Sequence, residues 1–568
     1  MDLENNILKF ALENAVKFKG RANPGSIIPK MIGLDPSLKS NMKELGGTIA
    51  KIVGEVNALS LEEQTKKLLE INPNYFNNQQ SAKKERQEQR KELPELKNAI
   101  MGKVCTRIPP EPSKYNHLGH AISFLLNYMY AIKYEGKCIM RFDDTNPEKE
   151  EQEYVDAMQE DVLEYLDIKP SSTVFASDHM QDFIDKAEQL IKEGHAYTGN
   201  QPSKDISIYR REMKDHPDRN KSTEQVMSEW KSMKEADEKF LDYTLRLKIS
   251  MQHKNAVMRD PVIFRVVNST HYRQNDKYHL WPMYDFECAI MEGKLETTHV
   301  LRSNEFDSRV ELQDHIRNYF GLPNPVVKQY ARFNVVGATT KGREIRELIE
   351  TGDYIGWDDP RLITLRALKR RGIVKEAYYE LAKVIGMSKT TSDLDFSVIA
   401  AINRQLLDES AKRFFFIKDP VEVTIENAPD QEVELSIHPH HSKGGRPFKT
   451  NDKFILSKED LNKIEDKELF RLMDCLNATK EGDKITFHST DVDTFKKSGK
   501  KIIHWLVNDE SQLANTEILM PDCTSLKAKA EKNIQLLKPG DIVQFERFGF
   551  CRLDSVKNDT YKFWFAHN

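Results

Sequence analysis

Cysteine is sparse and scattered in this chain of 568 residues. Its six cysteines, at positions 105, 138, 288, 475, 523 and 551, form no Cys-x-x-Cys pair. So few, scattered cysteines in so long a chain argue against a disulfide scaffold, and the missing pair argues against a zinc knuckle. The scattered spacing favours a reducing compartment.

Long apolar runs are missing as well. No stretch approaches the length that a membrane-spanning helix requires. The N-terminus, MDLENNILKF, lacks the basic, apolar and small-residue pattern of a secretory signal. We therefore expect a cytoplasmic protein without a membrane partner.

Charge of one sign does not dominate either. The chain holds 85 Lys and Arg residues against 89 Asp and Glu residues, a formal net charge of −4. This balance argues against non-specific coating of DNA, although so long a chain can carry a local basic surface. Charged residues at 31% and hydrophobic residues at 39% are typical of a globular protein. The length predicts several domains.

Changes of pattern along the chain predict these domains. The stretch LENNILKFALENAVKF near the N-terminus has apolar residues at helical spacing, and the charged stretch 81–98 is interpreted as a solvated helix or linker. From residue 101, the strand KVCTRI, a helix over 118–134 and the strand GKCIMRF form a βαβ unit. Such a unit predicts a parallel sheet with sites at the carboxyl ends of its strands.

The rest of the chain alternates between helical and strand patterns. Residues 178–283 are richly charged and are interpreted as an insertion, after which HLWPMYDFECAI and ETTHVLRSNEF are expected to resume the sheet. The last third has many short strands with Gly, Pro and Asp turns, which predict β-barrels. The predicted domains are a helical extension (1–100), a catalytic α/β domain (101–177 and 284–330), an insertion (178–283), a helical domain (331–408) and the barrels (409–568).

Two histidines lie at the junction of the first strand and helix, in PPEPSKYNHLGHA (109–121). A helix N-terminus favours anions such as phosphate. Gly119 permits close approach of a nucleotide, and His117 and His120 can donate hydrogen bonds to its phosphate oxygens. The motif therefore indicates an ATP site, although core or zinc-binding histidines remain alternatives on the motif alone.

Five motifs in order give this site a wider context. The segment RIPPEPSKYNHLGHA, followed by MRFDDTNPEKE, WPMYDF, HVLR and GWDDPRL, closely resembles the class I glutamyl/glutaminyl-tRNA synthetases. The content and spacing are similar to the archaeal–eukaryotic branch of glutamyl-tRNA synthetases. The resemblance runs from about residue 101 to the C-terminus. It implies a Rossmann-like catalytic domain with an inserted acceptor-stem-binding domain, a helical stem-contact domain and barrels that bind the anticodon.

The resemblance also implies which residues bind ATP. His117, Gly119 and His120 match the first class I signature, with Leu118 in place of the usual isoleucine. The second signature is degraded to ATTKGRE (338–344) and keeps one lysine, Lys341. One positioned ammonium is what the developing pyrophosphate charge requires.

On the amino-acid side, the resemblance implies that Arg107 and Glu111 belong to the substrate pocket and that Arg107 helps to hold the amino acid. Asp143 matches the residue that binds the substrate ammonium, while a helix cap is the alternative for Asp144 or Asn146. Tyr284 matches a pocket tyrosine.

The position eighteen residues after Tyr284 faces the side-chain end of the substrate in the family. Here that position is Arg302. A guanidinium separates glutamate from the nearly isosteric glutamine because only a carboxylate accepts its paired donors.

The implied activity is that of a glutamate–tRNA ligase, which uses ATP with Mg²⁺ to join L-glutamate to the 3′-terminal adenosine of tRNA-Glu. Whether tRNA-Gln is also charged stays open.

A monomer is expected. No zinc is expected, because the insertion lacks the cysteines that some relatives use for zinc. Cys288 leaves the pocket wall uncertain, and HPHHSKGGRP (438–447) is interpreted as a solvated loop and not a metal site. A glutaminyl enzyme, a truncated relative that glutamylates a tRNA base and an inactive tRNA-binding scaffold remain the rivals.

Overall fold

The structure is a computed structural model. It describes residues 3–568 apart from 19, 35–37, 39–41, 74, 76–91, 332, 338, 340, 387–391 and 441. The chain forms two compact units, Met1–Glu92 and Leu93–Asn568. Within the described ranges no helix is long and apolar enough to cross a membrane.

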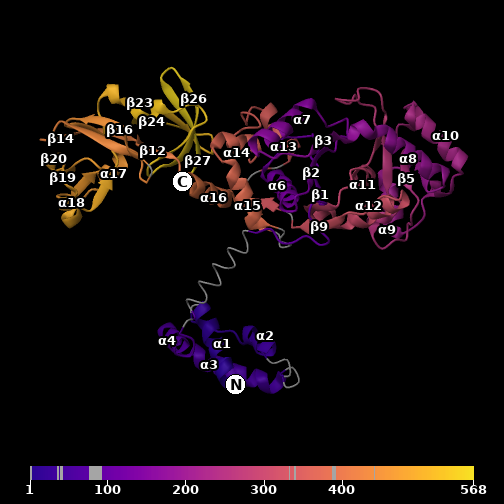
Figure 1. The fold of residues 1–568 in the computed structure, drawn as a ribbon, viewed down its shortest axis with the longest axis horizontal. Helices are drawn as coiled ribbons and strands as arrows, with labels where there is room; N and C mark the ends of the chain where they lie inside the picture. The colour runs from indigo at the N-terminus through magenta and orange to yellow at the C-terminus, as the bar shows by residue number, and fades with distance from the viewer. Residues whose placement is uncertain are drawn as a thin grey trace. The chain divides into compact units, whose positions relative to one another are not determined.

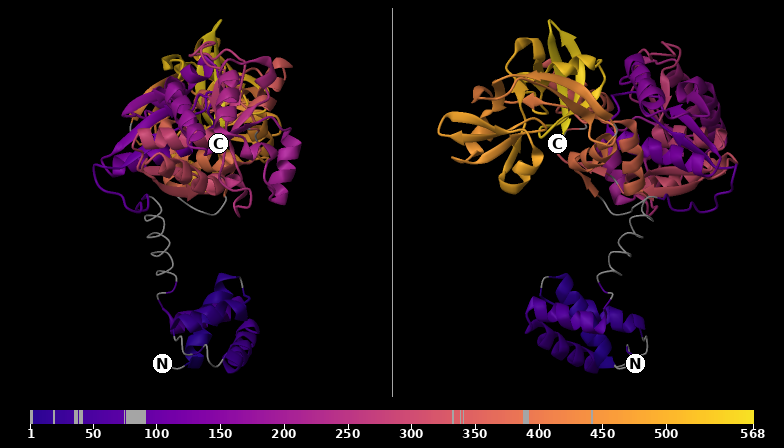
Figure 2. Two further views of the ribbon diagram at one scale, coloured as in Figure 1. Left: turned by 90° about the vertical axis from the view of Figure 1, so that its right-hand side faces the viewer. Right: turned by 60° about the vertical axis from the view of Figure 1, so that its left-hand side comes forward.

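The first unit is helical (indigo in Figures 1 and 2). Apolar residues at helical spacing, such as Leu12, Ile49 and Leu68, meet in one core. Ser60 and Glu63 form a reciprocal capping box at the start of the fourth helix. The helical N-terminal extension is confirmed, whereas residues 81–91 of the charged stretch lie outside the described residues. The helices are α1 (Leu3–Lys17), α2 (Pro24–Leu34), α3 (Met42–Asn57) and α4 (Leu61–Ile71).

The second unit begins with the predicted parallel sheet. β1 pairs in parallel with β2, the helix α6 connects them, and β3 extends the sheet. β8 and β9 form a second parallel pair, and the N–H of Thr298 donates to the carbonyl of Cys105 beside it at 2.9 Å. The βαβ prediction is confirmed. The elements are β1 (Cys105–Ile108), α6 (Leu118–Lys133), β2 (Lys137–Phe142), α7 (Gln152–Gln159) followed by a π-helical turn (Glu160–Tyr165), β3 (Ser172–Phe175), β8 (His299–Ser303) and β9 (Val326–Tyr330).

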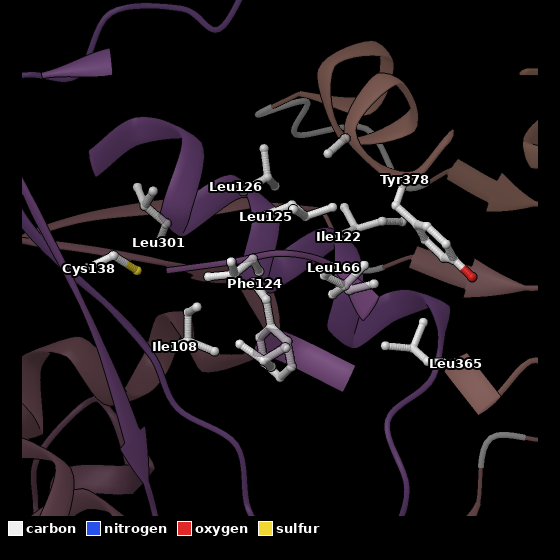
Figure 3. Close-up of a cluster of buried hydrophobic side chains, with 14 of the residues drawn as sticks. Ile108, Ile122, Phe124, Leu125, Leu126, Cys138, Leu166, Leu301, Leu365 and Tyr378 are labelled. Atoms are coloured by element: carbon white, nitrogen blue, oxygen red, sulfur yellow. The ribbon is translucent and has the colours of Figure 1, made fainter. Parts of the chain in front are cut away.

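One apolar core connects this sheet to helices far along the chain (Figure 3). Ile108 comes from β1, Ile122 and Leu125 from α6, and Leu365 and Tyr378 from helices after residue 331. Burying these side chains removes apolar surface from water and holds the strand ends in place. The segment that carries His117 and His120 therefore lies between two elements, β1 and α6, that are packed in this core.

Residues between β3 and β8 form a separate antiparallel sheet, in the order β4-β5-β6-β7, with helices around it. The expectation that HLWPMYDFECAI resumes the parallel sheet is wrong. β7 pairs antiparallel with β6, and Tyr284 then begins a helix because Phe286, Ala289 and Ile290 recur at helical spacing and are buried. The elements are α8 (Met180–Lys192), β4 (Ala196–Gly199), α9 (Ser203–Glu212), α10 (Thr223–Lys234), β5 (Thr244–Leu247), β6 (Val262–Val266), β7 (Leu280–Pro282) and α11 (Tyr284–Lys294), and α12 (Val310–Tyr319) lies between β8 and β9.

The region after residue 331 is mainly helical, as predicted, and one short parallel strand pair was not expected. It is attached directly to the first signature. The N–H of Leu118 donates to the carbonyl of Ile363 at 3.1 Å, and the N–H of Leu365 donates to the carbonyl of Asn116 at 2.9 Å. The elements are β10 (Phe333–Val335), α13 (Gly342–Glu350), α14 (Leu365–Arg371), α15 (Lys375–Ile385), β11 (Ser392–Leu394) and α16 (Phe396–Asp408).

The C-terminal part is all-β, as the alternating pattern predicts (orange and yellow in Figure 1). Two sheets have the orders β12-β25-β26-β27-β23-β24-β13 and β21-β18-β19-β20-β14-β17-β22, and β15 and β16 form a hairpin. The elements are β12 (Lys412–Phe414), β13 (Phe416–Ile417), β14 (Pro420–Glu426), β15 (Gln431–His438), β16 (Ser442–Thr450), β17 (Lys453–Ser457), α17 (Lys458–Lys463), β18 (Leu469–Leu472), β19 (Asn477–Glu481), β20 (Lys484–Ser489), α18 (Val492–Ser498), β21 (Lys501–Ile503), β22 (Leu506–Val507), β23 (Leu513–Leu519), β24 (Ser525–Glu531), β25 (Ile542–Phe545), β26 (Gly549–Lys557) and β27 (Thr560–His567).

The histidine run HPHHSKGGRP lies at the turn between β15 and β16, as expected. His438 is nevertheless buried, and its Nε2 lies 3.1 Å from the carbonyl of Asp408. The description as a solvated loop is therefore wrong for His438, since its ring packs against the end of α16. His440 is exposed and His441 lies outside the described residues.

Candidate active site

A cavity of about 930 Å³ is lined by residues at the carboxyl ends of the parallel strands. Arg107 is the last residue but one of β1, Asp143 follows β2, Arg302 lies in β8 and Tyr330 ends β9. Open parallel sheets bind ligands at this edge. The cavity brings together all the predicted site residues except Lys341, and their roles stay predictions: Arg107, Glu111, His117, Gly119, His120, Asp143, Tyr284 and Arg302.

The two signature histidines form the N-terminus of α6. His117 is the N-cap residue, and its Nδ1 accepts the N–H of Gly119 at 3.1 Å. His120 lies one turn on, and its Nδ1 accepts the N–H of His117 at 3.2 Å. The rings stack with centroids 3.9 Å apart. The imidazoles therefore cap the helix with one nitrogen each and have the other nitrogen left for a ligand.

Both imidazoles are neutral at physiological pH. Burial, reinforced by the Lys114 ammonium, lowers the pKa of His117 to about 3. Burial also lowers the pKa of His120 well below its usual value, with His117 and Lys114 adding to the effect. Because each Nδ1 accepts a backbone N–H, we place the ring proton on Nε2 in both residues. The pair thus offers two N–H donors that suit phosphate oxygens but brings no positive charge.

The charged side chain of Arg302 is buried and makes few hydrogen bonds within the protein. Its side chain is only 5% exposed, and Nη1 donates to the Tyr284 hydroxyl at a long 3.5 Å. Nε and Nη2 are buried and have no partner among the described residues. Buried donors without acceptors cost free energy, and a carboxylate satisfies two of them in a planar, bidentate pair. This end of the cavity therefore suits a ligand carboxylate.

Asp143 gives the cavity a carboxylate held in place by the protein. The Arg141 guanidinium forms a bidentate salt bridge with it, in which Nε donates at 2.5 Å and Nη2 at 2.9 Å. Glu287, which is 1% exposed, lies three residues after Tyr284 on α11 and lines the same cavity. Burial and then repulsion from Asp143 raise the pKa of Glu287 well above its usual value, so its neutral carboxyl donates a hydrogen bond to Asp143. A fixed carboxylate of this kind suits a ligand ammonium.

A layer of buried charges supports these residues. Glu292 accepts hydrogen bonds from Arg107 Nε at 3.1 Å and from Arg317 Nη1 at 3.0 Å. Burial alone would lower the pKa of Arg107, and the Glu292 carboxylate raises it instead. Cys288 was expected to form an uncertain pocket wall, but it does not line the cavity. Its thiol lies in the layer, donates to Glu292 at 3.2 Å and accepts from Arg141 at 3.5 Å.

Lys341 lies apart from this cavity. It is the N-cap residue of α13, its side chain is 76% exposed, and its Nζ pairs with Glu344 Oε1 at 2.7 Å. Arg346 of the same helix donates to the carbonyl of Ser113 at 2.7 Å. The helix that carries Lys341 is therefore bound to the Pro-rich loop beside the histidines. Glu111, in that loop, is exposed and lines the cavity.

Asp144 and Asn146 do not cap the next helix, which corrects the alternative considered for them. Asp144 is fully buried and accepts hydrogen bonds from the N–H and hydroxyl of Ser177 and from the hydroxyl of Tyr272. Burial raises its pKa to about 7. Asn146 accepts from Arg265 Nη2 at 2.7 Å. Both residues connect the end of β2 to the antiparallel sheet region, since α7 begins later and has Glu151 as its N-cap residue.

Several cavity residues gave no signal in the sequence. Lys114 and Glu150 line the cavity and lie within quoted motifs without an assigned role, and Arg265 and Glu287 line it from outside those motifs. Burial raises the pKa of Glu150 to about 9 and leaves this carboxyl neutral at pH 7. In the part of the chain that the structure describes, no three His, Cys, Asp or Glu side chains group so as to hold a metal ion.

Comparisons with known proteins match the whole length of the chain. Models of the tRNA synthetases class I (E and Q) match residues 103–409 as the catalytic domain, and residues 411–494 and 502–554 as anti-codon binding domains. The glutamate–tRNA ligase of Pyrococcus furiosus is 39% identical, with 100% of both chains covered. That of Nitrosopumilus maritimus is 36% identical, with 98% of each covered. The crystal structure of a glutamate–tRNA synthetase from Elizabethkingia anophelis is 17% identical and covers 54% of this chain and 71% of its own, with a TM-score of 0.36, too low to support an argument.

Proposed function

This chain belongs to the class I tRNA synthetases of the glutamyl and glutaminyl family, and on that premise we propose that it is a glutamate–tRNA ligase. It activates L-glutamate with ATP and Mg²⁺ and transfers the glutamyl group to the 3′-terminal adenosine of tRNA-Glu. Relatives that match over the full length carry the name glutamate–tRNA ligase, which supports the proposal.

The observation that carries the choice of glutamate is Arg302. Its buried guanidinium has two nitrogens without partners at one end of the cavity. The γ-carboxylate of glutamate accepts both, whereas the amide of glutamine would bring its NH₂ group against one of them. Leaving a buried donor against a donor is the kind of mismatch that gives an enzyme strong discrimination.

Asp143 holds the other end of the amino acid. Its carboxylate accepts hydrogen bonds from Arg141 and from the neutral Glu287, and it binds the substrate ammonium. With both ends held, the α-carboxylate lies towards the histidines. The enzyme's contribution to the first step is then positioning and electrostatic stabilisation, with little acid–base chemistry of its own.

In the activation step, the α-carboxylate of glutamate attacks the α-phosphorus of ATP in line. A bond forms between carboxylate oxygen and phosphorus, and the bond to pyrophosphate breaks. His117 and His120 donate Nε2–H to the phosphate oxygens as negative charge develops. Mg²⁺ bound with ATP would neutralise part of the phosphate charge. Lys341 approaches the leaving pyrophosphate by exchanging its contact with Glu344.

In the transfer step, the 2′-hydroxyl oxygen of the terminal adenosine attacks the glutamyl carbonyl carbon of the adenylate; an ester bond forms, the bond to AMP breaks, and AMP leaves with the hydroxyl proton passing to its phosphate. Residues 178–283 bind the acceptor stem, residues 331–408 contact the stem of the tRNA, and the β-domains of 409–568 read the anticodon. Unstacked anticodon bases pack on aromatic and arginine side chains in such domains. We further propose a monomer in the cytoplasm, with residues 1–100 as an accessory extension. Charging of tRNA-Gln is left to experiment.

Pyrophosphate exchange tests the proposal against its rivals. Labelled pyrophosphate should enter ATP when glutamate is present, and tRNA-Glu must be included because the family generally needs tRNA for activation. Exchange that depends on glutamine in place of glutamate would identify a glutaminyl enzyme. Absence of exchange with either amino acid would identify an inactive tRNA-binding scaffold.

A further inference from the structure

The nucleotide end of the cavity lacks positive charge from the residues already assigned to it. His117 and His120 are neutral, and Lys341 is paired with Glu344 and does not line the cavity. Formation of the adenylate releases pyrophosphate, whose developing charge needs a nearby cation. A second source of charge is therefore expected among the lining residues.

Lys114 lies where such a cation is needed. It lines the cavity three residues before His117, in the loop between β1 and α6. Its ammonium is close enough to both imidazoles to lower the pKa of each. Coulomb interactions in a partly buried site fall off over a few ångströms, so the ammonium lies near both imidazoles.

Two contacts position this lysine. The loop carbonyl of Ser113 accepts a hydrogen bond from Arg346 of α13 at 2.7 Å. The aliphatic stem of Lys114 packs against Gly342, where an added Cβ would lie 3.1 Å from the Lys114 Cβ. A side chain in place of Gly342 would press on that stem. The segment that carries Lys341 thus packs against Lys114 and holds it in place, although Lys341 itself does not line the cavity.

We propose that Lys114 is a catalytic residue that binds the polyphosphate of ATP and the departing pyrophosphate, together with His117 and His120. The inference deepens the proposed function and rests on it for the identity of the reaction. It assigns to Lys114 the charge that the histidines lack, in addition to the ammonium proposed above for Lys341.

The first experiment measures binding of inorganic pyrophosphate to the full-length protein by calorimetry, without amino acid or tRNA. Lys114→Met keeps the stem that packs on Gly342 and removes the charge, and Lys114→Arg keeps the charge. Loss of a charge-assisted hydrogen bond should weaken pyrophosphate binding of Lys114→Met by about tenfold to a hundredfold. Lys114→Arg should stay within a few-fold of the unaltered protein. Lys149→Met, an exposed lysine outside the cavity, is the matched control and should bind normally.

The second experiment measures single-turnover adenylation with glutamate and tRNA-Glu. Lys114→Met should lose on the order of 10²-fold in rate, as expected when one transition-state donor is removed, and Lys114→Arg should recover most of it. Thermal unfolding of each variant, with Lys114→Gln as a second neutral variant, separates loss of charge from loss of fold. Normal pyrophosphate affinity and normal adenylation in Lys114→Met would overturn the proposal, and so would equal losses in Lys114→Met and Lys114→Arg. If the unaltered protein shows no glutamate-dependent activity, the proposed function fails, while pyrophosphate binding still decides the role of Lys114.

Discussion

Replacing Arg302 by cysteine should damage the use of glutamate far more than the use of glutamine. The guanidinium is buried, donates one long hydrogen bond of 3.5 Å to Tyr284 and lies 5.6 Å from the centre of the Phe306 ring, so little is lost in the free enzyme. Almost all of the lost interaction energy is therefore lost from the complex with glutamate. Removing one partner of a desolvated, hydrogen-bonded charge pair costs about 2–5 kcal/mol, which is roughly 30-fold to several thousand-fold in kcat/KM.

The assay is kcat/KM for both amino acids in the presence of saturating tRNA-Glu. Glutamate efficiency should fall by at least the lower figure, the KM for ATP should hardly change, and glutamine should lose much less or gain. Arg107 also lines the cavity, so a complete switch to glutamine is not expected. Arg273→Gln, which removes an arginine whose Nη2 donates to both carboxylate oxygens of Asp178 outside the cavity, is the control.

Stability gives this prediction a second measurement. Because Nε and Nη2 of Arg302 have no hydrogen-bond partner in the described structure, Arg302→Cys removes a buried charge that the protein compensates only in part. The melting temperature of the free protein should stay unchanged or rise. A marked fall in melting temperature together with equal losses for glutamate and glutamine would show that Arg302 supports the fold or the common α-carboxylate, and the reasoning would be refuted.

Three further predictions test the nucleotide side and the buried acids. His120→Ala should lower the single-turnover adenylation rate by about 10²-fold or more, through loss of one donor to the transition state; a near-normal rate would remove its assigned role. Lys341→Ala should damage adenylation far more than tRNA affinity, and the reverse result would make it a contact to the tRNA backbone. Glu150 has its pKa raised by burial to about 9, above the 4.5 of an unburied glutamate, so its contribution to stability is complete below pH 4.5 and is lost as the pH rises to 9. Glu150→Gln should therefore flatten the decline in melting temperature between pH 6 and pH 9, and an unchanged decline would show that Glu150 is already ionised at pH 6.

The residues that the sequence predicts best are those whose spacing follows the backbone. The histidines must lie at the start of α6 because a strand and a helix flank them, and Arg302 is reached by counting from Tyr284. HLWPMYDFECAI was assigned wrongly because a short apolar run fits a strand or a helix equally well. Its second half is a helix that turns Glu287 to the same cavity as Tyr284.

Long-range contacts explain why the surroundings of some residues could not be predicted from the sequence. Asp144 looks like a turn residue in FDDTNP, yet Ser177 and Tyr272, far along the chain, bury it. In the sequence, Lys114 is an ordinary loop lysine, and only the fold brings it next to Gly342 and the histidines. Burial, and not residue type, decides that Glu150 is neutral.

Charging of purified tRNA-Glu with labelled amino acid tests the central claim most directly. With ATP and Mg²⁺, the full-length protein should attach glutamate to tRNA-Glu and leave glutamine unattached, and tRNA-Gln in a parallel reaction reports how wide its tRNA specificity is. Attachment of glutamine in preference to glutamate, or no attachment of glutamate to tRNA-Glu, would contradict the account.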